Sequence, residues 1–226
     1  MNIRNLLVGI VVAMSLAACE TVPQGRIELT KDVLAAQKGR VGVAISAPEP
    51  GLYLPGAACL LCIGAAKIAN SSLNEYATTL KADEMLAVRT EIVELMRKKG
   101  IDATAINGQL ELDKLPDRTL ATNMASKDYS SVGKGFDHLV VINVQQLGFV
   151  RTYSSYIPTS DPKATVGAFV FMVNLKTNAY EWWEHVQITR SAEGAWNEKP
   201  AFPGLTNAYF QAIEQAKDQI KSPFAE

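Results

Sequence analysis

Histidine, cysteine and net charge are all scarce in this sequence. The 226 residues include 2 His and 3 Cys, too few for a disulfide scaffold or for a metal site built from these residues alone. Lys and Arg number 22 against 23 Asp and Glu, which is not the basic excess that nucleic-acid binding needs, so we expect no nucleic-acid partner. With 15 Gly and no sustained heptad pattern, collagen-like and coiled-coil architectures are excluded.

Signatures of catalysis and of cofactor binding are also missing. The chain contains no G-x-S-x-G, no HExxH and no complete phosphate loop, because Gly133-Lys134-Gly135 lacks the length and the Lys-Ser/Thr ending. We therefore expect no catalytic residue, no metal and no cofactor. The alternative is an envelope hydrolase or ligand-binding enzyme that uses His138 or His185 with one of the many serines.

The N-terminus carries the most specific signal in the chain. Arg4 precedes an apolar run over residues 6–16, which is of signal-peptide length and too short to span a bilayer. The run ends in Leu16-Ala17-Ala18-Cys19, which resembles the bacterial lipobox. The resemblance implies removal of residues 1–18 and acylation of Cys19 on its thiol and its new amine. An ordinary signal peptide with an incidental cysteine is the alternative.

Lipidation of Cys19 predicts both location and organisation. Several acyl chains, at about 0.8 kcal/mol per buried CH₂, make a practically permanent membrane anchor. The lipobox resemblance further implies sorting to the outer membrane, because Glu20 and not Asp follows the cysteine. We expect a lipidated tether over residues 19–40 and a single periplasmic domain over 41–226.

Two further cysteines are spaced Cys59-Leu-Leu-Cys62. In an oxidising envelope this pair predicts a short-loop disulfide or two buried thiols. A redox C-x-x-C motif and half of a zinc site are the alternatives. A Pro-Gly turn precedes the pair, unlike the strand that precedes a thioredoxin-type motif, and the two histidines are far away in sequence.

Hydrophobic periodicity predicts an α+β fold with a mixed, mostly antiparallel sheet and helices packed on it. The clearest helix extends from Asp83 to Lys99, carries an apolar stripe and is stopped by Gly100. A second helix begins at Thr206, and Leu115, Leu120 and Met124 indicate a loosely packed one within residues 109–135. Strands are expected at 41–46, 101–106, 138–150, 166–175 and 180–188, with the first two parallel.

The segment 52–69 is apolar, with Lys67 as its single charge. Its simpler interpretation is a buried Ala-rich helix or hairpin, and its sharper one is an exposed surface that contacts the membrane or a partner protein. In the strand 180–188, alternation places Trp182 with Tyr180 on the inner face and Trp183 with His185 on the outer face. The candidate interaction surface comprises Leu52, Tyr53, Leu54, Leu60, Leu61, Trp183 and His185; further candidate contacts are Tyr153, Tyr156 and Trp196.

Four segments carry a resemblance to a group of bacterial lipoproteins: Arg40–Ser46, Lys98–Ile101, Phe136–Val141 leading to Leu147-Gly148, and Val173–Trp182. Across roughly 41–221, their order resembles the fold of curli-secretion lipoproteins, the TolB N-terminal domain and lipoprotein activators of peptidoglycan synthases. The resemblance implies a non-catalytic protein that acts in envelope assembly or secretion through protein–protein contact. We accordingly expect an envelope protein partner or a homo-oligomer, with a CxxC redox protein as a further alternative.

Overall fold

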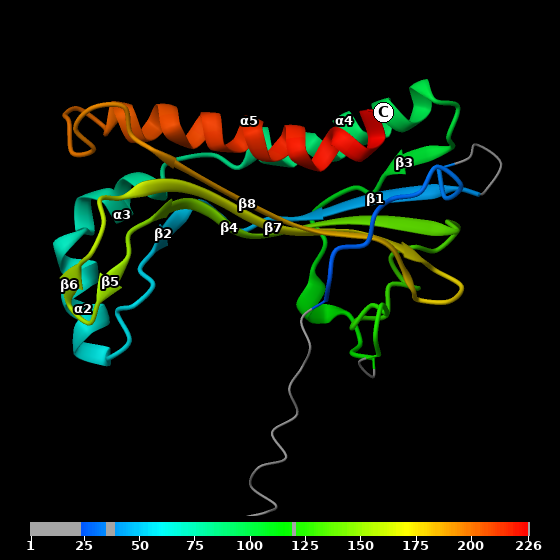
Figure 1. The fold of residues 1–226 in the computed structure, drawn as a ribbon, viewed down its shortest axis with the longest axis horizontal. Coiled ribbons are helices and arrows are strands. Elements are labelled where there is room, and N and C mark those ends of the chain that lie inside the picture. Colours follow the sequence, from blue (N-terminus) through cyan, green and yellow to red (C-terminus); the bar gives the residue numbers. More distant parts are fainter. Residues whose placement is uncertain (1–23, 35–38, 119–120, 226) are drawn as a thin grey trace, which may run out of the picture.

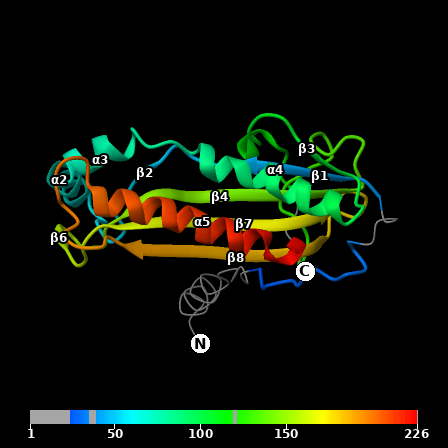
Figure 2. The same cartoon turned by 90° about the horizontal axis from the view of Figure 1, so that it is seen from above.

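The computed structural model describes residues 24–34, 39–118 and 121–225, so the leader 1–18 and Cys19 lie outside the described residues. These residues form the expected α+β fold: a six-stranded mixed sheet with two long helices side by side on one face (Figures 1 and 2). The elements are β1 (Val41–Ser46), β2 (Gly51–Tyr53), α2 (Leu60–Ala69), α3 (Ser71–Ala77), α4 (Asp83–Lys98), β3 (Ala103–Ala105), a 3-10 turn (Leu112–Lys114), β4 (His138–Val150), β5 (Tyr153–Ser154), β6 (Ile157–Pro158), β7 (Lys163–Asn174), β8 (Tyr180–Ser191) and α5 (Pro203–Ala225).

The long strand β4 organises the sheet. The strand order is β3-β1-β4-β7-β8, and β2 pairs with the far end of β4, beyond the end of β1. Strands β4, β7 and β8 are antiparallel, and β1 is parallel to β3 as the sequence predicted. Strand β1 is also parallel to β4. The three long strands β4, β7 and β8 follow one another as an antiparallel meander, and the parallel strands lie beside β4.

Helices α4 and α5 bury a continuous core against one face of the sheet. The stripe Met85, Val88, Ile92 and Met96 on α4 is fully buried, as its 3.6-residue spacing predicts. Helix α5 begins at Pro203, three residues before the predicted start, and the hydroxyl of Thr206 donates to the backbone of the preceding turn. The opposite face of the sheet is called the lower face below.

The segment 109–135 covers the β1 end of the lower face. Leu115 and Tyr129 pack there with Leu139, Val141 and Phe171. The predicted helix around Leu115 and Met124 is wrong for the described part of this segment, where the 3-10 turn is the one helical element, and Leu120 lies outside the described residues. Backbone groups of the segment bond to other elements instead, as when Leu110 N–H donates to Ile45 and Ala125 N–H to Asn178.

Candidate functional site

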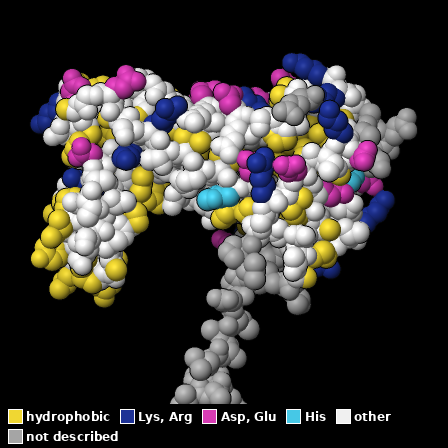
Figure 3. Space-filling model, viewed as in Figure 1, with side chains coloured by type: hydrophobic (Ala, Val, Ile, Leu, Met, Phe, Trp, Pro, Cys, Tyr) yellow, Lys and Arg dark blue, Asp and Glu magenta, His cyan; other side chains and the backbone are white. Residues whose placement is uncertain are grey.

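Much of the lower face beneath β4, β7 and β8 lies open. The 109–135 segment covers one end of this face, and an arm descends from the other end (Figure 1). The arm consists of α2 and the β5–β6 hairpin, whose Tyr153 packs with Cys62 and Ala66 of α2. Figure 3 shows the hollow between the two. Within it the side chains of Gln145, His185 and Gln187 are exposed.

An aromatic ladder lines the roof of this hollow. Antiparallel pairing places Phe169 of β7 opposite His185 of β8, and Phe171 opposite Trp183. The Phe169 ring consequently stacks on Trp183 at 5.6 Å and lies 5.0 Å from the His185 ring, measured between ring centroids. Phe169 is 37% exposed and Trp183 is half-buried. Partly exposed rings held by strand backbones form a rigid surface that can bury apolar area in an interface.

The outer edge of β8 is open beside the ladder. Among the described residues, this edge makes backbone hydrogen bonds only near its start, where Tyr180 N–H donates to Asn123 and Trp183 exchanges two bonds with Ile27. From Glu184 to Ser191 the outward backbone groups have no protein partner in the described part of the chain. An unpaired edge of this length can accept a strand from another chain.

The arm carries exposed apolar side chains on two separate segments. Leu60 and Leu61 at the start of α2 are 90% and 86% exposed, and Ile68 near the end of the same helix is 78% exposed. In the β5–β6 hairpin, Tyr156 is 66% and Ile157 is 56% exposed. Helix α2 therefore has two apolar faces. Cys62 and Ala66 lie on the buried inner face, and the exposed Leu60, Leu61 and Ile68 lie outside it.

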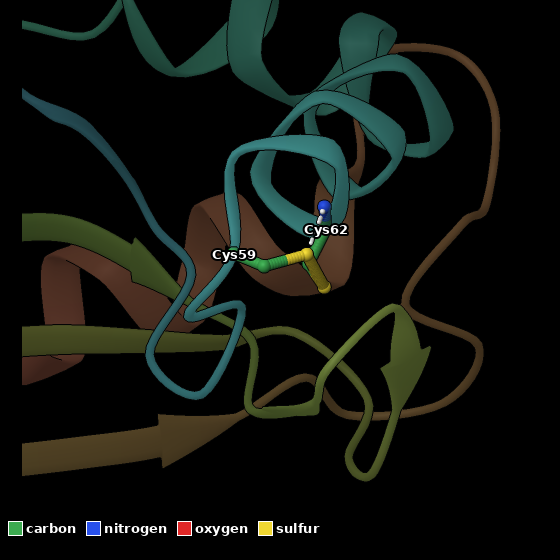
Figure 4. The surroundings of a disulfide bond; sticks show 2 residues. All are labelled: Cys59 and Cys62. Carbon is green, nitrogen blue, oxygen red and sulfur yellow. Dashed lines mark hydrogen bonds between the residues drawn. A yellow bond between two sulfur atoms is a disulfide. The ribbon is translucent and has the colours of Figure 1, made fainter.

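A disulfide closes the first turn of α2 (Figure 4). Cys59 and Cys62 are bonded, and Cys59 Sγ also accepts a hydrogen bond from Cys62 N–H at 3.0 Å. Cys59 is thus the N-cap of the helix, and Cys62 is buried in the arm. The bridge encloses Leu60 and Leu61, and because Cys62 points inward these two leucines point outward. Among the described residues no group of His, Cys, Asp and Glu has the arrangement of a metal site.

A buried polar joint fixes the arm to the sheet. Asn70, which is 2% exposed, donates to Tyr153 Oη at 2.6 Å and accepts from Arg151 Nη1 at 2.8 Å. The Arg151 guanidinium in turn lies 5.1 Å from the Trp196 ring centroid. The close approach of the chain before α2 to the β5–β6 hairpin also requires Gly56, where φ is +88° and a Cβ would lie 1.9 Å from the Tyr153 carbonyl oxygen. Helix and hairpin are therefore held in one orientation.

Residues 24–34, predicted to be tether, lie against the domain. Ile27 pairs with Trp183, and Leu29 and Leu34 pack on the main core. Gln24 Nε2 donates to Asn123 Oδ1 at 2.9 Å, which places the start of the described chain at the 109–135 segment. Four residues, 20–23, separate Cys19 from this docked segment, and they lie outside the described residues.

The other histidine belongs to a separate buried cluster. His138 donates through Nδ1 to the Glu181 carboxylate, and Asn174 donates to the other carboxylate oxygen at 2.9 Å. Burial raises the pKa of Glu181, but these hydrogen bonds and the His138 charge lower it more, so the net pKa is below the ordinary glutamate value. His138 lies on the helix-covered face and His185 on the lower face. The structure does not bring the two histidines into one site.

Replacing Glu181 with Gln is expected to reduce stability at neutral pH by about 1–2 kcal/mol, because His138 loses an ionised acceptor. A lowered folded-state pKa stabilises the fold above the unfolded pKa, and this contribution disappears as the pH falls through the folded pKa. The difference between wild type and Glu181→Gln should therefore shrink below about pH 4.3. Urea unfolding at pH 7 and pH 3 measures it, with the exposed Glu94→Gln as control. A difference that grows in acid would contradict this sign.

The remaining predicted surface residues divide into two groups. Leu60, Leu61 and His185 are exposed, whereas Leu52, Tyr53 and Leu54 are half-buried in packing and hydrogen bonds at the root of the arm. Of the other aromatics, Tyr153 is buried, and Trp196 stacks on Phe202. Sequence reasoning missed Phe169 and Ile157, and it included Ile68 only as part of the segment 52–69. The uncharged run at 152–160 was the one signal that pointed toward the hairpin.

No family model and no curated protein matches this chain. Solved structures with a similar arrangement include a Xanthomonas campestris protein of the DUF330 family, at 12% identity and TM-score 0.41, covering 90% of this chain and 94% of that one. A PelC dodecamer from Paraburkholderia phytofirmans gives 9% identity, TM-score 0.33 and coverages of 89% and 95%. A Neisseria meningitidis lipoprotein gives 15% identity and TM-score 0.26, covering 77% of this chain and 99% of that one. These likenesses are distant and assign no activity to this chain.

Within the described residues, no helix has both the length and the apolarity needed to cross a bilayer.

Proposed function

We propose that this chain is a lipid-anchored protein of the bacterial envelope whose domain binds another protein through the open part of the lower face. The lipobox at Cys19 supports the anchor, and Glu20 supports outer-membrane sorting with the domain in the periplasm. The observation that carries the binding role is the partly exposed ladder of Phe169, Trp183 and His185 beside an unpaired strand edge.

A protein fits this surface better than a small molecule does. Small ligands are usually enclosed in concave pockets that bury most of their surface, whereas the ladder is spread along two strands in a broad hollow. A strand added to the edge of β8 would satisfy the backbone groups from Glu184 to Ser191, while its side chains contact the ladder. The partner is an envelope protein or a second copy of this chain, and the role is assembly and not catalysis.

Site-specific photocrosslinking in intact cells tests this function. A photoreactive residue at position 185 is expected to give one dominant protein adduct, whereas the same residue at Thr90, exposed on α4, is expected to give none. The mass of the adduct distinguishes a second copy from a different protein. Adding Phe169→Ser should reduce the adduct about tenfold, as for a central aromatic contact. Recovery of uncrosslinked monomer alone from position 185 would overturn the proposal.

A further inference from the structure

We propose that the arm tip, formed by Leu60, Leu61, Ile68, Tyr156 and Ile157, inserts into the surface of the bilayer that holds Cys19. The protein then contacts the membrane at two places, through the lipid on its N-terminus and through the arm tip. This inference rests on the proposed lipid anchor, and it adds a membrane-binding site made by the folded domain itself.

The exposure of the tip is built into the fold. The two leucines lie inside the Cys59–Cys62 bridge, whose second cysteine is buried, so they cannot turn inward without breaking the packing of α2. Asn70 and its bonds to Tyr153 and Arg151 hold the hairpin against α2. Two segments some ninety positions apart in sequence thereby present their apolar side chains together (Figures 1 and 3).

The charge pattern favours lipid as the occupant. Residues 50–74 contain one charged side chain, Lys67, and residues 152–160 contain none. Carboxylates are costly to bring to the hydrocarbon boundary, and none is present in either segment. Around the apolar residues lie hydroxyl groups, including those of Tyr156, Ser154 and Ser155, and tyrosine is enriched where a membrane meets water. By contrast, the 109–135 segment carries exposed charges of both signs.

The position of the chain start brings the tip to the bilayer. Gln24 is held at Asn123 on the lower face, and Cys19 precedes it by five residues, which can span at most about 18 Å. The arm projects from the sheet on this same side (Figure 1). A lipid on Cys19 therefore keeps the lower face close to the membrane. Once the tip is inserted, the aromatic ladder faces the bilayer across the hollow, and its partner must be a segment near the membrane surface.

Depth-dependent quenching tests the insertion. The full chain isolated from membranes is reconstituted in phosphatidylethanolamine–phosphatidylglycerol vesicles containing lipids brominated on their acyl chains. An environment-sensitive fluorophore at position 157 is expected to lose about half its emission, as for a group that reaches the acyl boundary. The same fluorophore at position 94, on α4 above the sheet, should be unaffected. With Leu60→Ser and Leu61→Ser, quenching at 157 should fall to the level at 94 while the melting temperature is unchanged.

Three results would overturn the inference. One is equal emission at position 157 with and without brominated lipids, and another is equal quenching at 157 and 94. The third is a fluorophore at 157 that is protected from the brominated lipids while two copies of the chain crosslink there, which would assign the tip to a protein interface. The crosslinking at position 185 is scored separately. Loss of that adduct with quenching intact would therefore refute the partner and leave the membrane site.

Discussion

Replacing Cys19 with serine is expected to abolish both acylation and removal of residues 1–18. Serine lacks the sulfur to which the diacylglyceryl group is attached, so the lipobox no longer offers a substrate. The expected result is complete: no labelled palmitate in the chain, and a product larger by the uncut leader. Metabolic labelling followed by immunoprecipitation measures both effects.

The matched control is Cys59→Ser, which removes the arm disulfide and leaves the lipobox intact. Label and leader cleavage should be the same as in the wild type. Palmitate in the Cys19→Ser chain, or its loss from the Cys59→Ser chain, would contradict the assignment of the lipid to Cys19.

Trp182→Ala is expected to lower the free energy of unfolding by about 3–5 kcal/mol. The Trp182 side chain is 1% exposed, and its ring meets Phe224 of α5 edge-on at a centroid distance of 5.2 Å. Alanine leaves a cavity between β8 and α5 that the rigid strand cannot close. Leu29 packs on this same core, so the substitution also weakens the packing of the N-terminal segment 24–34 against the domain.

Trp183→Ala, at the neighbouring position of β8, is the control because it removes the same side chain from the other face of the sheet. Trp183 is half-buried on the lower face, and its removal should cost only about 1 kcal/mol. Denaturant unfolding monitored by circular dichroism gives both values. Equal losses from the two substitutions would mean that the open face is as tightly packed as the core, which contradicts the description of the hollow.

The core elements followed directly from the sequence because local pattern and burial agree there. The run 138–150 is rich in β-branched residues and mostly buried, and the helix from Asp83 has one apolar stripe; both match the structure within a residue. Strand β7 begins three residues earlier than predicted and β8 ends three residues later, because the pairing between the two strands continues to Lys163 and Ser191.

Tyr180 shows why simple alternation failed at one position. It was predicted to share a face with Trp182, but it packs against Phe171 on the lower face. The pairing skips one residue of β8 between Met172 and Val173, and this irregularity reverses the side on which Tyr180 lies. A bulge leaves no clear mark in the hydrophobic pattern of a short strand.

The apolar segment 52–69 combines both interpretations that its sequence allowed. Ala57, Cys62 and Ala66 are buried, as the simpler interpretation expected, whereas Leu60 and Leu61 are exposed. Composition alone does not distinguish the two faces, because α2 is apolar on both. The convergence of α2 with the hairpin depends on the buried Asn70 joint, whose partners Arg151 and Tyr153 are about eighty residues away in sequence.

Intact-mass analysis of the protein extracted from cell membranes tests the anchor on which location, orientation and arm insertion all depend. The account predicts a chain that begins at Cys19 and carries the added mass of acyl groups, with a terminal peptide that fragments to place them on that residue. A chain that still contains residues 1–18, or one with an unmodified Cys19 thiol, would contradict it.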